Sequence, residues 1–320
     1  MRPGEGGIVR RFSFGKPVCA GAAGVLLLVA VGCSDPIVNA PPGGGTVVEA
    51  TFRLGPFNLA PMGQSGDQSQ STRSNIPRPT GAFGLKTIDF DLVDASGNPI
   101  PRMDVHLHHV VLMNTARTSP FCSNWNERFA GAGTERTPLS LPDPYAYMVG
   151  ANDHWNALWH VMNMSDMPHQ VFIQYRIGYQ PGATTQNTRP ATPFFLDIAG
   201  NGCGNSEFNV PGDGGPGSVF TASKTWTVPW DGYLIGAGGH LHAGGIDLAL
   251  QNATTGDYCT MTAHYGPDSP MGFPTEITRC TTHKRILAGQ TVRVTARYDN
   301  SEPRAGVMGI VLAYAWRGTQ

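Results

Sequence analysis

Short runs of alternating apolar and polar residues recur along most of the chain. These runs are rich in β-branched and aromatic residues, and Gly, Pro, Asn and Asp separate them. A period of two is typical of strands that bury one face, and no long stretch keeps the period of an amphipathic helix. The pattern predicts an all-β protein built of antiparallel sandwiches. The expected strands are 47–54, 85–93, 105–113, 157–162, 171–178, 225–228, 233–237, 246–251, 290–298 and 307–316.

A glycine-rich segment at residues 201–217 interrupts this pattern. It holds too few apolar side chains to form core, so it is a natural domain boundary. We expect one β-sandwich at residues 47–204 and a second, in tandem, at 205–320. A Pro/Gly-rich linker at 34–46 is expected to precede them.

The first residues predict export. Several basic residues precede an apolar run at residues 20–31, which is too short to span a membrane comfortably and is typical of a signal peptide, here residues 1–33. The end of the run, AVGC at residues 30–33, resembles the lipobox of bacterial lipoproteins. We expect Cys33 to carry a lipid that anchors the protein to the cell envelope, facing the periplasm or the cell surface, with ordinary cleavage as the alternative.

Charge and cysteine content narrow the class of protein further. Only 14% of residues are charged and the net charge is -1, with no basic patch, so we expect no nucleic-acid partner. Four cysteines lie beyond Cys33, and an even number in an oxidising compartment favours two disulfides. We expect Cys122 to pair with Cys203 and Cys259 with Cys280, because each pair falls within one half of the chain. A cysteine metal site is disfavoured, since no CxxC spacing occurs.

The densest group of histidines lies at the start of an apolar strand. His106, His108 and His109 fall in the sequence HLHHVVLMN. In a regular strand His106 and His108 share a face while His109 points away, so two adjacent ligands require the strand to end or bulge there. Three histidines beside a buried run are costly unless ligated or hydrated, so this cluster favours a metal site. His106 is expected in a supporting or exposed position.

Three later segments supply further candidate ligands. His240 and His242, in GAGGHLHAGG, are expected on one strand face with glycines that permit a close approach to the backbone, although a pair of solvated histidines is the alternative. His160 lies within an expected strand, where a structural histidine is the alternative. Met308 enters the last strand, where methionine ordinarily fills core. Histidines with a soft sulfur suit copper, whereas three imidazoles accept copper or zinc.

The order of these residues resembles the type II, ascorbate-dependent copper monooxygenases, such as the catalytic cores of peptidylglycine alpha-hydroxylating monooxygenase and dopamine beta-monooxygenase. The resemblance runs over nearly the whole mature chain. HHV at 108–110 stands where the family has His-His-Met, and RTPLSLPDPYAYMVGANDHWNALWHVMN at 136–163 resembles the segment leading to its third histidine. HLH at 240–242 resembles the family's His-Thr-His, and residues 288–308 resemble its final strands, which supply a methionine.

This resemblance implies two copper ions per chain in two jelly-roll-like sandwiches that face each other across a solvent-filled cleft. The first, an electron relay, would be held by His108, His109 and His160. The second, where dioxygen is used, would be held by His240, His242 and Met308, which are therefore the expected catalytic residues. The implied activity is hydroxylation of a small-molecule substrate with dioxygen and ascorbate or another external reductant, by a monomeric protein.

Departures from the family pattern leave other functions open. Gly238, Ile310 and Leu312 stand where the peptide-processing member has polar groups, so a less charged substrate is expected. A copper-binding envelope lipoprotein without turnover is the main alternative. A glycan-binding or adhesion sandwich with incidental histidines is a third. The remaining histidines are expected to face solvent: His154, His169, His264 and His283.

Overall fold

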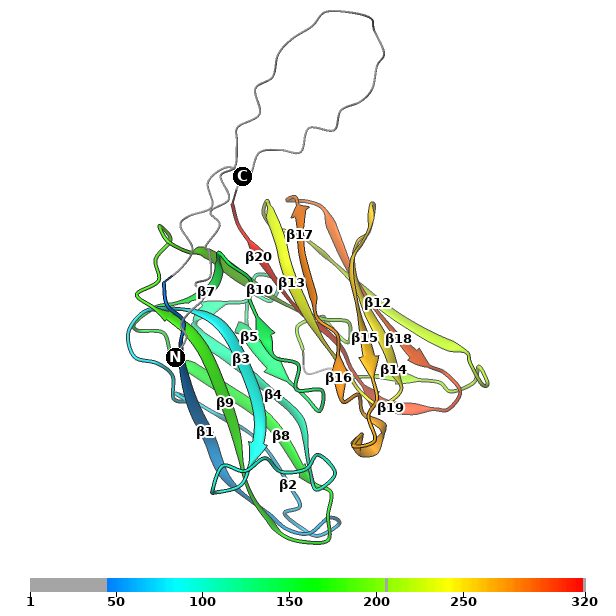
Figure 1. The fold of residues 1–320 in the computed structure, drawn as a ribbon. Helices are drawn as coiled ribbons and strands as arrows, with labels where there is room; N and C mark the ends of the chain where they lie inside the picture. Colours follow the sequence, from blue (N-terminus) through cyan, green and yellow to red (C-terminus); the bar gives the residue numbers. More distant parts are fainter. Residues whose placement is uncertain (1–44, 205–206, 319–320) are drawn as a thin grey trace, which may run out of the picture. The chain divides into compact units, whose positions relative to one another are not determined.

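A computed structural model describes residues 45–204 and 207–318, and these residues belong to one compact unit. They form strands and a single 3-10 turn at Pro270–Gly272, with no α-helix in the described part (Figure 1). The expected all-β, antiparallel sandwich class is therefore confirmed. The signal peptide, Cys33 and most of the linker lie outside the described residues. Nowhere in those residues is there a helix with the length and apolar character needed to cross a bilayer.

The strands are arranged in one large sheet and three smaller ones (Figure 1). In spatial order the large sheet contains β1 (Val48–Leu59), β9 (His169–Pro181), β3 (Phe83–Val93), β7 (Tyr145–Val149), β10 (Arg189–Asp197), β20 (Gly309–Trp316), β13 (Gly232–Leu241) and β17 (Cys280–Ile286), with β6 (Leu139–Ser140) paired to β3. The four-stranded sheet contains β2 (Gln68–Arg73), β8 (Trp155–Asn163), β4 (Val105–Thr118) and β5 (Asn126–Ala132). The five-stranded sheet contains β12 (Val219–Thr227), β18 (Thr291–Asp299), β14 (Gly245–Asn252), β15 (Gly256–His264) and β16 (Glu276–Ile277). β11 (Phe208–Val210) pairs with β19 (Arg304–Val307).

Two apolar clusters form the core. One joins β1, β3 and β9 of the large sheet to β4, β5 and β8, with Trp155 and Phe129 completely buried. The other joins β10, β13 and β20 to the five-stranded sheet. The large sheet runs through both clusters because β7 and β10 pair in parallel at Arg189 and Tyr145. A domain boundary near residue 205 stays a prediction, since the described residues form one unit.

A bulge in β4 positions the first histidine group. Leu107 is paired with Val161 on β8, but the next residue paired, His109, faces His160, so His108 is the extra residue. The extra residue lets two adjacent side chains turn toward one place, which a regular strand forbids. The sequence required the strand to end or to bulge here, and the structure has the bulge.

The second group lies where β13 ends beside the start of β20. His240 is paired with Ile310, and His242 follows the last residue of β13. The expected strand 307–316 is wrong in one respect, because it is broken at Met308 into β19 and β20. The break frees Met308 from the regular alternation of a strand.

Two disulfides link the chain, Cys122 to Cys203 and Cys259 to Cys280. These are the pairs expected from the sequence. The first joins the loop after β4 to the loop after β10, and the second joins β15 to β17.

Candidate metal centre

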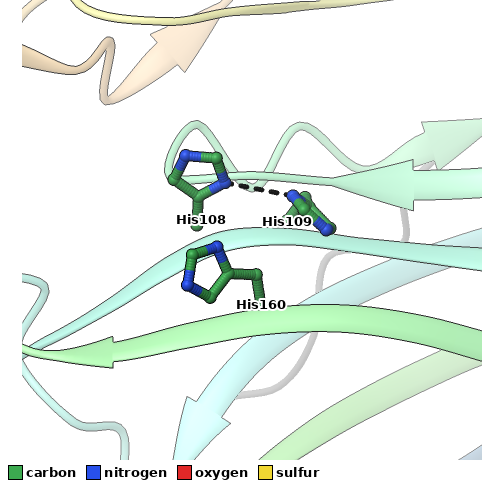
Figure 2. A group of neighbouring side chains, drawn as sticks. All are labelled: His108, His109 and His160. Carbon is green, nitrogen blue, oxygen red and sulfur yellow. Dashed lines mark hydrogen bonds between the residues drawn. The ribbon is translucent and has the colours of Figure 1, made fainter. Parts of the chain in front are cut away.

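The first histidine group consists of His108, His109 and His160. One ring nitrogen from each lies within 4.8 Å of the others, and His108 Nδ1 is 3.0 Å from His109 Nδ1. Figure 2 shows the three rings gathered between β4 and β8, with the two Nδ1 atoms facing each other. Two such nitrogens repel unless a proton or a cation lies between them, so the arrangement suits a metal ion.

Hydrogen bonding and burial favour the ligand form of these imidazoles. His160 Nε2 lies 2.7 Å from Gln68 Oε1, an acceptor, so Nε2 carries the proton and Nδ1 keeps its lone pair. Burial, reinforced by the neighbouring histidines, lowers the pKa of His109 to about 3 and lowers the pKa of His108 still further. Neutral imidazole is the form that binds metal, so the group needs no deprotonation at neutral pH.

His240 and His242 form the second group, with ring centroids 5.2 Å apart. His240 Nδ1 is 3.2 Å from both carboxylate oxygens of Glu135, and His242 Nδ1 donates to the carbonyl of Gly306 at 2.8 Å. Both Nδ1 atoms therefore carry protons, and both Nε2 atoms keep lone pairs. These Nε2 atoms are buried and have no hydrogen-bond partner among the described residues. A carboxylate or carbonyl on the far nitrogen is the usual support for a metal-binding histidine.

Tyr298 ties Met308 to the same group. The backbone N–H of His242 donates to the Tyr298 hydroxyl at 3.0 Å, and that hydroxyl donates to the carbonyl of Met308. Burial raises the pKa of Tyr298, so its hydroxyl keeps the proton that it donates. Met308 and His240 line one cavity.

The two groups touch each other. The ring centroids of His108 and His242 are 4.7 Å apart, and Phe273 packs on both, at 5.7 and 5.1 Å. A cleft separating the two groups, which the family resemblance implied, is therefore absent at this point. The ring of His108 lies as close to that of His160, at 4.7 Å, and so stands between the two groups.

The other histidines differ in part from expectation. His106 is completely buried, with its Nδ1 3.1 Å from Thr134 Oγ1 and its ring 5.7 Å from that of His108, so an exposed position is wrong and a supporting one fits. Its Nε2 has no partner among the described residues. His154, His264 and His283 are exposed as expected, whereas His169 is half-buried against Ser165.

A cavity of about 540 Å³ adjoins both groups through His109, His240 and Met308. Its walls are mainly apolar and include all three residues that replace the polar groups of the family. The apolar wall residues include Val111, Leu139, Leu141, Leu158, Gly238, Ile310 and Leu312. A largely apolar pocket with a few polar groups is typical of a small-molecule site.

Sequence reasoning missed the residues that support the second group. Glu135 lies in the segment GAGTE, which has no recognisable motif, and comes from the loop after β5. Gly133 lies so close to His240 that a β-carbon there would be 2.5 Å from the ring. No local pattern signals either residue, because their partner lies more than a hundred positions away.

Comparisons with known proteins point to copper chemistry in distant relatives. The chain is 26% identical over 238 residues to the probable copper-dependent oxygenase M1 of Phoma sp., covering 67% of this chain and 58% of that protein. It is 26% identical over 236 residues to the probable copper-dependent oxygenase clz3 of Cochliobolus lunatus, covering 67% of this chain and 72% of that one. The chain therefore spans less than two thirds of the first relative.

Residues 46–128 match the family described as stress up-regulated Nod 19. Among solved structures, PNGF-II aligns over 85% of this chain and 66% of its own, with 9% identity and a TM-score of 0.38.

Proposed function

We propose that this protein is a copper-dependent monooxygenase that hydroxylates a small-molecule substrate with dioxygen and an external reductant such as ascorbate. The observation that carries the proposal is the pair of buried Nε2 atoms on His240 and His242, which have lone pairs and no partner among the described residues. Their Nδ1 atoms are already held by Glu135 and Gly306. The two distant relatives named as probable copper-dependent oxygenases support the same chemistry.

The donor set fits copper. His108, His109 and His160 offer three imidazoles, which accept Cu(I) or Cu(II), and a thioether beside two imidazoles favours Cu(I) over zinc. We place one copper ion in the first group and one with His240, His242 and Met308, as in the type II monooxygenases that the chain resembles. Bound copper would supply the one-electron chemistry that dioxygen requires.

The chain's own residues hold and orient the reactants. Glu135 and the carbonyl of Gly306 fix the ring orientation and tautomer of the two histidines. The largely apolar cavity beside them would hold an apolar substrate next to His240 and limit the access of water to it. The overall reaction balances when one C–H bond becomes C–OH, the second oxygen atom leaves as water, and the reductant supplies two electrons with two protons.

We also propose that the protein is exported and held to the cell envelope by a lipid on Cys33. The two disulfides are compatible with an oxidising compartment. Replacing Cys33 with Ala should move the protein from the membrane fraction to the soluble fraction. Unchanged membrane association of that variant would contradict the anchor.

Metal content and oxygen uptake test the enzymatic proposal directly. Protein purified from a copper-replete host should hold two copper ions per chain and give a Cu(II) electron paramagnetic resonance signal that ascorbate removes. It should consume dioxygen only when ascorbate is present. A single zinc ion per chain, or no metal, would overturn the proposal.

Variants separate turnover from copper storage. His242→Ala and Met308→Ala should abolish ascorbate-dependent oxygen uptake, with circular dichroism unchanged. His154→Ala is the matched control, because His154 is exposed and outside both groups. Tight copper binding by the wild type without any oxygen uptake would instead identify a copper-binding protein without turnover.

A further inference from the structure

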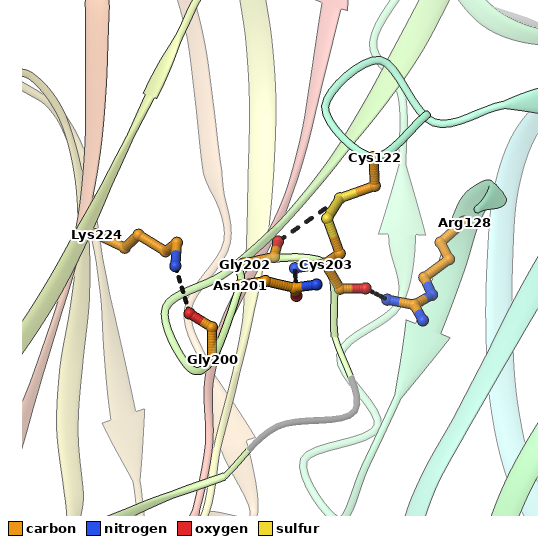
Figure 3. The surroundings of a disulfide bond; sticks show 7 residues. All are labelled: Cys122, Arg128, Gly200, Asn201, Gly202, Cys203 and Lys224. Atoms are coloured by element: carbon orange, nitrogen blue, oxygen red, sulfur yellow. Dashed lines mark hydrogen bonds between the residues drawn. A yellow bond between two sulfur atoms is a disulfide. The ribbon is translucent and has the colours of Figure 1, made fainter. Parts of the chain in front are cut away.

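Arg128 is a buried cation at the cavity. It lies on β5, is only 5% exposed, and lines the cavity that reaches His240. Its guanidinium stacks on Trp125 at 4.4 Å and on Phe195 at 4.6 Å. Nη1 donates to the carbonyl of Cys203 at 2.6 Å, as Figure 3 shows.

The opposite edge of this guanidinium is unused. Both Nε and Nη2 of Arg128 are buried and have no hydrogen-bond partner among the described residues. These two N–H groups lie on the same edge and form the fork that binds a carboxylate through two parallel hydrogen bonds. Buried donors are rarely left without acceptors. Nε and Nη2 of Arg136 are also unpartnered, but Arg128 in addition lines the cavity, where a ligand can supply the acceptor.

No carboxylate of the described residues lies within salt-bridge distance of Arg128. The acidic group that raises its pKa is Asp197, which acts from beyond salt-bridge distance. Asp197 is completely buried, and burial raises its pKa to about 6, so at neutral pH most of it is ionised and offsets part of the charge of Arg128 from a distance. Burial lowers the pKa of Arg128 only to about 10, so the guanidinium stays charged at neutral pH. A buried cation of this kind favours an anionic partner.

The distance from this fork to the second histidine group sets the length of a ligand. Arg128 on β5 and Gly133, which directly follows β5 and lies next to His240, are separated by five positions, or about 16 Å for extended chain. On the opposite wall, Phe195 is paired with Leu312, four positions from Met308, or about 13 Å. Apolar side chains line the cavity between these ends.

We propose that the substrate is an elongated, largely apolar carboxylic acid, with its carboxylate on Arg128 and its apolar body extending toward His240 and Met308. This inference rests on the proposed function for the reacting end, but the carboxylate site stands on the contacts of Arg128. It also sharpens the expectation of a weakly charged substrate. Gly238, Ile310 and Leu312, which stand where the family has polar groups, form apolar walls. The single charge of the substrate is recognised by Arg128 at the far end of the cavity.

Ligand binding tests the proposal without turnover. Dodecanoate and dodecanol, which differ in the terminal group, are titrated calorimetrically into the mature protein with and without copper. We expect dodecanoate to bind at least about tenfold more tightly than dodecanol. Both probes make the apolar contacts, but only the carboxylate can form a charged, bidentate pair with Arg128. Arg128→Gln should remove this preference, and Arg128→Lys should retain only part of it.

Two further variants keep the result interpretable. Gly238→Leu should weaken both probes alike and keep the preference, because a β-carbon at Gly238 meets no atom within 4 Å and the larger side chain extends into the cavity. Arg317→Gln, which alters an exposed arginine stacked on Trp230, should change neither affinity.

The possible outcomes separate this proposal from the enzymatic one. Equal binding of acid and alcohol, a preference that survives Arg128→Gln, or no binding of dodecanoate would overturn the carboxylate site. An Arg128-dependent preference in a protein that binds no copper would uphold the carboxylate site and overturn the monooxygenase.

Discussion

Glu135 lies against His240 with both carboxylate oxygens 3.2 Å from Nδ1. The side chain of Glu135 is 2% exposed, and its Oε1 also accepts the N–H of Gly133 at 2.8 Å. The carboxylate is therefore fixed from both sides, which fixes the ring of His240. The proton is held on Nδ1, and the lone pair of Nε2 is left for a metal.

Glu135→Gln should weaken copper binding at His240 and His242 by roughly 10- to 100-fold. The Gly133 N–H keeps the amide oxygen, so the amide NH2 faces His240 Nδ1. His240 Nδ1 must then accept a hydrogen bond from the amide. The ring proton therefore moves to Nε2, where it occupies the lone pair that would bind the metal. Competition with a chromophoric Cu(I) chelator measures the affinity of each site.

A carboxylate elsewhere on the same cavity provides the control for this change. Glu276 lines the cavity but is exposed, so Glu276→Gln should leave both copper affinities unchanged. If Glu135→Gln also leaves them unchanged, Glu135 does not set the tautomer of His240.

Tyr298→Phe should destabilise the fold and weaken the second site together. It leaves the His242 N–H and the Met308 carbonyl without their shared hydroxyl. Losing buried hydrogen bonds of this kind costs about 1–3 kcal/mol of unfolding free energy. Urea unfolding and Cu(I) competition give the two quantities.

The hydroxyl of Tyr265 serves for comparison. It donates to the carbonyl of Gly245, but Tyr265 is 47% exposed, so water can replace that bond. Tyr265→Phe should cost less than Tyr298→Phe and leave copper affinity intact. Equal losses in the two variants would contradict a special role for Tyr298.

The sequence predicted the strands that carry the first histidine group, but it ended the strand at 237, before His240, and did not predict the supports of the second group. Alternation within one strand is a local property, so the strand at His160 and the bulge required by adjacent His108 and His109 could both be inferred. The partners Glu135 and Tyr298 depend on long-range packing, which a period of two does not encode. Glu135 meets His240 because the fold brings the loop after β5 to β13, and Tyr298 meets His242 and Met308 from β18.

Several strands were missed for a similar reason. β5 (NERFAGA) and β10 (RPATPFFLD) interrupt the apolar alternation with glycine, proline or charge. Arg128 and Asp197 occupy positions in these strands that are buried in the fold. A charged residue at a buried position breaks the apolar alternation, so the strand is not recognised from the sequence. One of these residues, Arg128, lines the candidate substrate cavity.

The metal-free protein should lose stability on acidification below about pH 6.5. Burial lowers the pKa of His106 and of His242 to about 3, whereas unfolding restores a value near 6.5. Between these values the unfolded chain binds more protons, so the free energy of unfolding falls as pH falls. Each group contributes up to about 2 kcal/mol of loss between pH 7 and pH 5. Urea unfolding at the two pH values measures it.

Single variants assign this pH dependence. His106→Gln offers Thr134 a polar partner but removes the titrating ring, so the loss between pH 7 and pH 5 should shrink. His154→Gln, at an exposed position, should show the wild-type loss. An unaltered loss in His106→Gln would mean that other groups cause the acid sensitivity.

The two disulfides should contribute unequally to stability. Cys122 and Cys203 are 81 positions apart, whereas Cys259 and Cys280 are 21 apart. Loop-closure entropy predicts losses of about 4.5 and about 3.3 kcal/mol when each pair is replaced by serine. Removing the first pair also frees the loop whose Cys203 carbonyl holds Arg128, so the preference for dodecanoate should weaken in that variant alone. Urea unfolding and calorimetry measure both effects. A larger stability loss for the second pair, or an unchanged preference without the first, would contradict this coupling.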